Sequence, residues 1–235
     1  MSQAQSRRGR KVAAKKQNPL VPFYWGIGAL VILGAAFLIT YAARGGFGGG
    51  AVTPVNAPVG RTDEGFWYKG NPDASVKVIK YSDYQCPSCA FYFNNLGSIV
   101  TRDYIETGRI QFIYHEFPLD SHRHAVAAGE AARCAGDQGN YWGMHDMLFM
   151  NQDQWSQLNT VNNVYSGYAG QLGLNRAEFD ACMSGGTHNA EVVAAGQASI
   201  ARGVTGTPTF DVNGQLVDMN GLPGAIEAAL RAAGQ

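Results

Sequence analysis

The sequence of 235 residues predicts an α/β domain in which the order β-α-β is followed by a helical insertion and then by β-β-α, behind one transmembrane helix. Two β-rich runs, at 76–82 and 110–114, enclose a helical pattern that extends to about Thr107. Such a β-α-β unit pairs its strands in parallel. About 170 residues remain after the N-terminal segment, which is enough for one sizeable core.

The N-terminal segment has the pattern of a membrane anchor at residues 22–43. Its mostly apolar run from Pro22 to Tyr41 would span, as a helix, about 30 Å, the thickness of the hydrocarbon core of a bilayer. Residues 1–21 form a basic tail without acidic residues, which predicts a cytoplasmic N-terminus and export of the chain after Arg44. The basic residues of the tail are Arg7, Arg8, Arg10, Lys11, Lys15 and Lys16.

A cleaved signal peptide is the alternative, because Thr40-Tyr41-Ala42 offers a small-residue cleavage site. The apolar run is longer than a signal-peptide core, and the Gly/Pro-rich residues 44–62 suit a flexible linker, so an uncleaved anchor is preferred. Either way the folded domain is expected outside the cytoplasm, tethered to the cell membrane or secreted. Disulfides persist in that environment.

The charge distribution argues against nucleic acid as a partner. The whole chain has no net charge, but without the basic tail residues 17–235 carry 12 basic and 18 acidic residues. An acidic domain lacks the positive surface that a nucleic-acid backbone attracts.

Residues 121–202 are alanine-rich and are expected to form an inserted domain of several short helices. One helix start is marked by Asn175 as its N-cap, with Glu178 three residues later, as in a capping box. Glycines that punctuate the helices are Gly136, Gly139, Gly173, Gly185 and Gly186.

The C-terminal part returns to strand character at 209–212 and 215–217. Asn213-Gly214 between these runs is a strong hairpin signal. A helix from Leu222 to Ala233 is predicted to close the chain.

The motif Cys86-Pro87-Ser88-Cys89, at the junction between the first predicted strand and the helix that follows it, indicates thiol–disulfide exchange. Pro87 at the helix start places the Cys86 sulfur beside unpaired N–H groups and the positive end of the helix dipole, which both favour a thiolate. Cys89 lies one turn further, so the pair can close to a disulfide and open by accepting a substrate thiolate. Cys86 is the predicted attacked sulfur and Cys89 the resolving thiol, supported by Pro87 and Ser88.

The cysteine pair has two other possible interpretations. The spacing is also half of a zinc site, but Cys134 and Cys182 stand alone and no second ligand pair occurs at finger-like spacing. Two buried, inert cysteines are the second alternative, which Pro and Ser at a strand-to-helix junction do not favour. No metal and no cofactor is expected.

Five segments, in order, together resemble a known family: Asn71-Pro72-Asp73-Ala74, residues 82–89, Phe117-Pro118-Leu119, residues 131–135 and residues 203–210. The chain resembles the DsbA-like thioredoxin family, in particular its membrane-anchored bacterial branch of thiol:disulfide interchange proteins. The resemblance spans roughly residues 63–233. It implies a thioredoxin-like domain of residues 63–120 and 203–235, with residues 121–202 inserted.

The resemblance also implies a cis peptide bond before Pro208. That bond would turn the backbone of Thr207 toward Cys86, where it can pair with an extended substrate segment. An X-Pro bond in a folded protein is cis only about 5–6% of the time, so an ordinary trans proline at the strand entry is the alternative.

Cys134 and Cys182 lie on two predicted helices of the insertion and are expected to bond to each other as a structural disulfide. The alternative is a second redox pair that relays electrons to Cys86. Neither cysteine has the neighbouring Cys or the helix-start position that lowers a thiol pKa.

One departure from the family concerns the proton chemistry. Many relatives carry a buried carboxylate six residues before the first cysteine, where this chain has Lys80. A nearby ammonium lowers a thiol pKa, whereas a carboxylate raises it. Alternatively, Lys80 reaches solvent. With no carboxylate at this position, the expected proton carrier is Asp83, Glu116 or a water chain, and the sequence does not decide among them.

The expected function is that of an exported thiol-disulfide oxidoreductase, an oxidase that donates its Cys86–Cys89 disulfide to reduced exported polypeptides. The resemblance implies a quinone-linked membrane partner of the DsbB or vitamin K epoxide reductase type that re-oxidises it. Alternatives are a thiol reductase or disulfide isomerase with the same cysteines, and a tethered peptide-binding holdase in which they are structural.

Overall fold

The computed structural model describes residues 30–36, which are helical, and residues 55–235. These belong to separate compact units, Met1–Gly49 and Gly50–Gln235. The predicted tail at 1–21 and most of the predicted anchor at 22–43 lie outside the described residues. Within the described ranges, no helix combines the length and hydropathy needed to cross a membrane.

A six-stranded mixed sheet forms the centre of the second unit, in the order β1-β2-β4-β3-β5-β6. β3 and β4 are parallel and in register from Val76 beside Ile110 to Ser82 beside Glu116, whereas all other neighbours are antiparallel. The predicted β-α-β unit and the predicted hairpin at Asn213-Gly214 are confirmed. The strands are β1 Val59–Arg61, β2 Trp67–Gly70, β3 Val76–Ser82, β4 Ile110–Glu116, β5 Thr209–Val212 and β6 Gln215–Val217.

The linker prediction for residues 44–62 was wrong at its C-terminal end, because β1 begins at Val59. β1 and β2 are too short to be marked by alternation, and they are held by pairing: Tyr68 of β2 lies between Gly60 of β1 and Ile113 of β4. A Cβ atom on Gly60 would come within 2.7 Å of the Tyr68 hydroxyl, so the strand approaches its neighbour closely at a residue without a side chain.

The helix after β3 runs with two π-helical turns through α2 (Pro87–Tyr92), η1 (Phe93–Gly97), α3 (Ser98–Val100) and η2 (Thr101–Ile105). Pro87 occupies its first turn, where a missing N–H leaves no hydrogen bond unmade. The predicted end near Thr107 is close to the observed one, because Gly108 adopts φ +71° and turns the chain toward β4.

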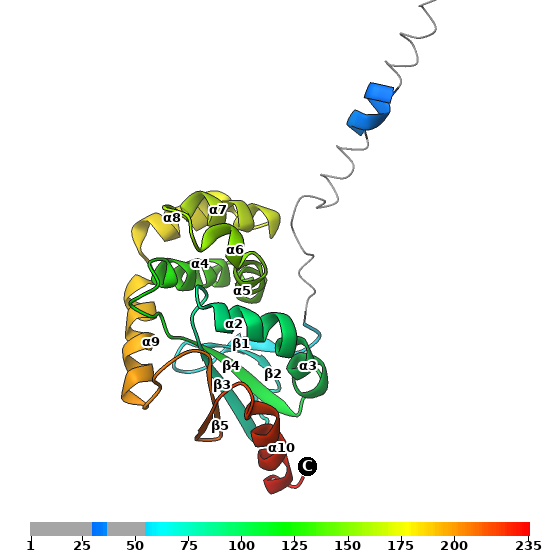
Figure 1. The fold of residues 1–235 in the computed structure, drawn as a ribbon, viewed down its shortest axis with the longest axis vertical. Coiled ribbons are helices and arrows are strands. Elements are labelled where there is room, and N and C mark those ends of the chain that lie inside the picture. The colour runs from blue at the N-terminus through cyan, green and yellow to red at the C-terminus, as the bar shows by residue number, and fades with distance from the viewer. Residues whose placement is uncertain (1–29, 37–54) are drawn as a thin grey trace, which may run out of the picture. The chain divides into compact units, whose positions relative to one another are not determined.

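Helices α4 to α8 of the insertion gather at one end of the sheet in Figure 1, whereas α9 runs beside the sheet and α10 lies at the other end. Asn175 caps α8 as predicted, because its Oδ1 accepts from the N–H groups of Ala177 and Glu178. The bounds are α4 Ala125–Asp137, α5 Tyr141–Met150, α6 Gln152–Trp155, α7 Asn162–Gln171, α8 Arg176–Gly185, α9 Asn189–Ala201 and α10 Leu222–Ala232.

Alternate residues of β3 face the two sides of the sheet. Val76 and Val78 join the large core formed with α2, α10 and the insertion. Tyr81 belongs to a smaller cluster with Phe117 and Val204 on the opposite face. The side chain of Lys80 therefore points to the same face as Val76 and Val78, the face that α2 covers.

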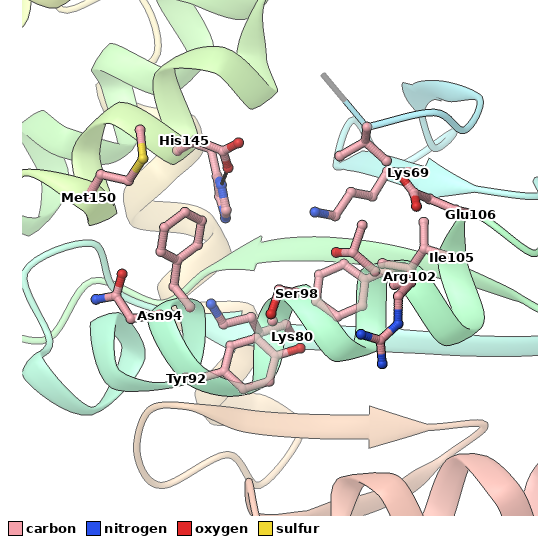
Figure 2. A pocket seen from close by; sticks show the side chains of 16 residues that line it. Lys69, Lys80, Tyr92, Asn94, Ser98, Arg102, Ile105, Glu106, His145 and Met150 are labelled. Carbon is pink, nitrogen blue, oxygen red and sulfur yellow. Dashed lines mark hydrogen bonds and ion pairs between the residues drawn. The ribbon is translucent and has the colours of Figure 1, made fainter. Parts of the chain in front are cut away.

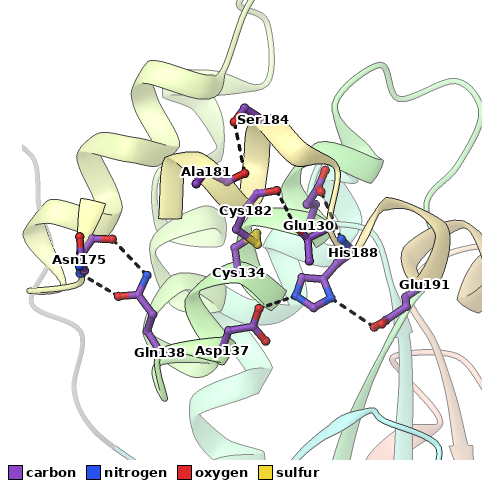
Figure 3. The surroundings of a disulfide bond; sticks show 11 residues. Glu130, Cys134, Asp137, Gln138, Asn175, Ala181, Cys182, Ser184, His188 and Glu191 are labelled. Carbon is purple, nitrogen blue, oxygen red and sulfur yellow. Dashed lines mark hydrogen bonds and ion pairs between the residues drawn. A yellow bond between two sulfur atoms is a disulfide. The ribbon is translucent and has the colours of Figure 1, made fainter. Parts of the chain in front are cut away.

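A disulfide between Cys134 of α4 and Cys182 of α8 ties two helices of the insertion together, as predicted. Figure 3 shows it beside His188, whose Nε2 lies 2.7 Å from an oxygen of Asp137. Cys134 is buried in the core, whereas Cys182 is partly exposed, so the bond lies at the edge of the packed structure.

Replacement of both cysteines, as C134A/C182A, is expected to lower the free energy of unfolding by about 2 to 4 kcal/mol. The disulfide joins residues 48 positions apart and thereby restricts the unfolded chain. Urea unfolding of oxidised protein and of the double variant measures the difference. An unchanged urea midpoint would show that the bond contributes nothing to stability.

Candidate active site

The two remaining cysteines lie at the N-terminus of α2, where the sequence places them, and both are free thiols. Cys86 is the N-cap residue, and its carbonyl accepts the N–H groups of Cys89 and Ala90 at 3.1 and 3.2 Å. Cys86 retains 6% of its surface, whereas Cys89 has none exposed. Pro87 and Ser88 are exposed beside them. Only Cys86 is therefore placed to meet a substrate.

The environment separates the two thiols in acidity. A hydrogen bond from the Cys89 thiol, together with contacts to Thr207 and to the N–H groups of Cys89 and Ser88, lowers the pKa of Cys86 to about 5 against the effect of burial. Burial, and then the interaction with Cys86, raise the pKa of Cys89 well above its usual value. Near neutral pH the reduced site thus holds one thiolate, on Cys86, and one thiol, on Cys89.

The Thr207–Pro208 peptide bond is cis. The Cys86 thiol donates to the Thr207 carbonyl at 3.4 Å, so this loop and the helix start meet as the sequence predicts. The Thr207 hydroxyl, in contrast to the carbonyl, is buried and has no hydrogen-bond partner among the described residues. It is consequently free to donate to Cys86 once that sulfur is ionised.

Lys80 is buried, with 1% of its surface exposed, so the alternative in which it reaches solvent does not hold. Its ammonium lies 4.6 Å from the ring centre of Phe149 and 4.7 Å from that of Tyr92. Burial lowers the pKa of Lys80 to about 8, and the charges of Cys89 and Cys86 oppose that change. The Lys80 ammonium is thereby buried where its charge interacts with those of the cysteines.

Asp83 and Glu116 are engaged elsewhere. Asp83 accepts from the N–H groups of Gln85 and Leu119, at 2.7 and 2.9 Å, and contacts His122 Nδ1 at 2.8 Å. Burial raises its pKa, although these donors oppose the change. Glu116 forms an ion pair with Arg133 of α4 at 2.8 Å. Of the three predicted modulators of the thiol pKa, Lys80 is the one that the structure brings to the cysteines.

Sequence reasoning missed Ser82, which lies on the same face of β3 as Lys80 and is 1% exposed. Its hydroxyl helps to lower the pKa of Cys89 against the effect of burial. The alternation of β3 was the signal that could have found it, since residues two apart share a face.

Two glutamines that sequence reasoning also missed form hydrogen bonds between the segment around Cys86 and the insertion. Gln152 of α6 donates to the carbonyls of Tyr84 and Cys86, at 2.7 and 3.0 Å. Gln85 donates to the carbonyl of Ser156 at 2.8 Å and accepts from the N–H of His124 at 2.7 Å. No sequence pattern marks these contacts, because they join residues far apart in the chain.

The one group of metal-binding residue types that comes together within the described part of the chain is Cys134, Cys182 and His188, with ligand atoms within 4.8 Å. Both sulfurs of that group are bonded to each other, so neither is a thiolate. Cys86 and Cys89 belong to no such group in residues 30–36 and 55–235. The geometry gives no support to the zinc interpretation of the cysteine pair.

The rate at which iodoacetamide alkylates Cys86 is expected to stay nearly constant from pH 8 to pH 6 and to fall about tenfold per unit below about pH 5, because the thiolate is the nucleophile. The lowered pKa also makes the reduced protein more stable as pH rises from about 5 toward the unfolded thiol value of about 8.5. Mass spectrometry of the alkylated peptide gives the rate. A midpoint near pH 8.5 would contradict the assigned environment.

Lys80→Met is expected to raise the pKa of Cys89 and to shift the equilibrium with glutathione toward the disulfide at least about threefold, because a cation that stabilises thiolate is removed. Methionine keeps an apolar side chain of similar length beside the rings of Tyr92 and Phe149. Lys77→Met, on the opposite face of β3, is the matched control. Equal equilibrium constants for the two variants would remove Lys80 from the thiol chemistry.

A family profile described as Thioredoxin matches residues 62–232. A protein of Rickettsia bellii named as a candidate protein-disulfide oxidoreductase is 28% identical over 174 residues, covering 72% of this chain and 66% of the relative. A Bacillus anthracis relative, named as a candidate disulfide bond formation protein D, is 27% identical over 175 residues, 69% of this chain and 77% of its own.

Among solved structures, oxidised BdbD from Bacillus subtilis superposes with a TM-score of 0.65 at 22% identity, covering 75% of this chain and 99% of that one. MdbA of Corynebacterium diphtheriae, described as a thiol-disulfide oxidoreductase, gives 0.62 at 22% identity over 76% of this chain and 96% of its own. The chain spans from about half to two thirds of the length of the Rickettsia relatives that it matches.

Proposed function

Because the chain belongs to the thioredoxin family, in its DsbA-like thiol:disulfide branch, we propose that it is a protein thiol-disulfide oxidoreductase acting as an oxidase. Its Cys86–Cys89 disulfide is donated to reduced polypeptides. The observation that carries the proposal is the unequal pair of thiols, in which the more accessible Cys86 is the stronger acid. A stabilised Cys86 thiolate favours the reduced enzyme and so makes its disulfide a good oxidant.

The exchange proceeds in two displacements. A substrate thiolate attacks the Cys86 sulfur of the disulfide, the Cys86–Cys89 bond breaks, and its electron pair leaves on Cys89, which takes up a proton. A second substrate thiolate then attacks the substrate sulfur of the mixed disulfide, and Cys86 leaves as a thiolate. The substrate is oxidised by two electrons and the enzyme is reduced by two.

The Thr207 backbone would align an extended substrate beside Cys86 by strand addition. The proposed location, expected from the basic tail and apolar run at the N-terminus, is outside the cytoplasm on a membrane anchor, where newly exported chains arrive with free thiols. A quinone-linked membrane protein of the DsbB or vitamin K epoxide reductase type would return the cysteines to the disulfide. Neither location nor partner bears on the chemistry of the first displacement.

The redox potential of the full chain, equilibrated against graded glutathione buffers, tests the proposal. Alkylation and mass spectrometry follow Cys86 and Cys89 separately from Cys134 and Cys182. A potential above about −150 mV supports the oxidase, and one near −250 mV assigns a reductase instead. A Cys86–Cys89 pair that never exchanges would overturn both in favour of a peptide-binding module.

A further inference from the structure

A cavity of about 490 Å³ lies behind the active-site helix, lined by residues of β2, β3, β4, α5 and the helix from α2 to η2. Its volume falls within the range of small-molecule sites, about 300–1,000 Å³. The walls are largely apolar and include Phe93, Phe112, Ile105, Met150 and Val55. Such walls suit the body of an organic molecule.

Three ionisable side chains that are almost completely buried line the same cavity: Lys69 at 8%, Lys80 at 1% and His145 at 3% exposure. They come from β2, β3 and α5, respectively. Figure 2 shows Lys69 and His145 reaching into the cavity from two sides, and Lys80, which also lines it, beside Tyr92. Distant parts of the chain thus converge on one small volume.

Neither ammonium has a carboxylate within 4 Å anywhere in residues 30–36 and 55–235. Lys69 lies over the ring of Trp142 at 4.8 Å, and Lys80 lies among aromatic rings, so the close contacts of both are cation–π contacts. Burial lowers the pKa of Lys69, and the more distant charges of Asp146 and Glu106 oppose that change. A buried cation without a partner is unfavourable, because burial removes its hydration, so an anion that entered the cavity would be favoured.

His145 adds a further unsatisfied atom. Its Nδ1 lies 2.7 Å from Asp146, and its buried Nε2 has no hydrogen-bond partner among the described residues. Burial lowers its pKa to about 4, and the charges of Lys80 and Lys69 act in the same direction. The ring is therefore neutral, and Nε2 offers an acceptor to a ligand or to a water bound with it.

The other charged residues at the cavity already have partners. Asp146 is held by His145, and Glu106 is exposed and accepts the N–H of Asn56 at 3.1 Å. Arg102 pairs with Asp103 at 2.6 Å. The unpaired charge in the buried part of the cavity is thus positive.

We propose that this cavity binds a small organic monocarboxylate, whose carboxylate accepts hydrogen bonds from Lys69 and Lys80 and whose apolar body packs against the aromatic and aliphatic walls. Inorganic phosphate fits less well, because it would leave those walls in contact with water. The site lies apart from the surface at Cys86, Thr207 and Pro208 where the polypeptide substrate would bind.

Binding there is coupled to the cysteines through Lys80, a part of the inference that rests on the proposed function. A thiolate on the cysteine pair and the carboxylate of the ligand interact with the same ammonium. The disulfide form of the protein lacks the thiolate, so it binds the carboxylate more tightly. By linkage, the ligand then favours the disulfide by the same factor.

Benzoate and its neutral analogue benzamide are the probes, titrated into the full chain in neutral detergent. Calorimetry measures affinity, and the ring signals of histidine-labelled protein report His145 by NMR. We expect a dissociation constant of about 1 mM for benzoate with the disulfide form, in line with so small a ligand, and binding at least about tenfold weaker for benzamide. Lys69→Met should weaken benzoate at least about tenfold, whereas the exposed Lys77→Met should not.

Three results would overturn the site: no saturable shift of the His145 signal, equal affinity for benzoate and benzamide, or unchanged affinity in Lys69→Met. The two probes test the role of charge on the unmodified protein, so the result stands even if Lys69→Met fails to fold. Benzoate should bind the reduced form at least about threefold more weakly, and equal binding to both forms would overturn the coupling. A Cys86–Cys89 pair that never exchanges without ligand would refute the proposed function and leave the binding measurement intact.

Discussion

Cys86→Ser is expected to reduce the oxidation of a thiol peptide by this protein to the uncatalysed rate. A serine hydroxyl stays protonated in the environment that ionises Cys86, and it cannot form the mixed disulfide. Stopped-flow fluorescence of a peptide that closes its own disulfide measures the loss. Substantial turnover by Cys86→Ser would mean that other sulfurs carry the exchange.

Cys89→Ser is the companion variant and should behave differently. This variant cannot form the internal disulfide, so it no longer oxidises substrate, but its Cys86 thiolate still attacks a disulfide-bonded peptide and releases one of that peptide's sulfurs as a thiolate. Because no Cys89 thiol attacks the resulting mixed disulfide, covalent complexes with the disulfide-bonded peptide accumulate on non-reducing gels. C134A/C182A is the matched control, because that pair lies in the insertion and should leave exchange at the Cys86 site intact. Trapped complexes in Cys86→Ser, or none in Cys89→Ser, would reverse the assigned roles.

Arg133→Met is expected to lower the free energy of unfolding by about 3 to 5 kcal/mol. The guanidinium of Arg133 forms a bidentate pair with Glu116, at 3.0 and 2.8 Å, and both side chains are at most 5% exposed. Burial lowers the pKa of Arg133, but the Glu116 charge more than offsets this. Removal of the arginine would leave a buried carboxylate supported mainly by the Tyr141 hydroxyl, at 3.2 Å.

Urea unfolding of the full chain, followed by tryptophan fluorescence, measures that loss. Arg102→Met removes an arginine whose ion pair is exposed, so it should change stability little. The double variant Glu116→Gln/Arg133→Met no longer buries an unpaired charge and should regain part of the loss. If Arg133→Met were as mild as Arg102→Met, the buried pair would not be a main support of the fold.

Features with a local physical cause were predictable from the sequence. The strand at 76–82, the helix begun by Pro87, the cap at Asn175 and the hairpin at Asn213-Gly214 all depend on neighbours in the chain. The cysteine pair was found for the same reason, because strand, cysteine, proline and helix are contiguous.

Features that depend on distant partners were not predictable. Lys80 shares a face with Val76 and Val78, but its burial also requires Phe149 from the insertion. Glu116 ends a strand near the site, and only the fold reveals that Arg133 occupies its oxygens. β1 and β2 were missed because hydrogen bonds to neighbouring strands, rather than their own residues, make them strands.

The contacts of Gln85 and Gln152 limit how far this enzyme can be trimmed by protein engineering. A minimal version that joins residue 120 directly to 203 would retain β1 to β6, yet the carbonyls of Tyr84 and Cys86 would lose the Gln152 amide, and Gln85 would lose both of its partners. Residues 84–86, which precede the helix start, would then lose their hydrogen bonds to the insertion. Swapping the insertion between homologues therefore also exchanges part of the support beneath the cysteines.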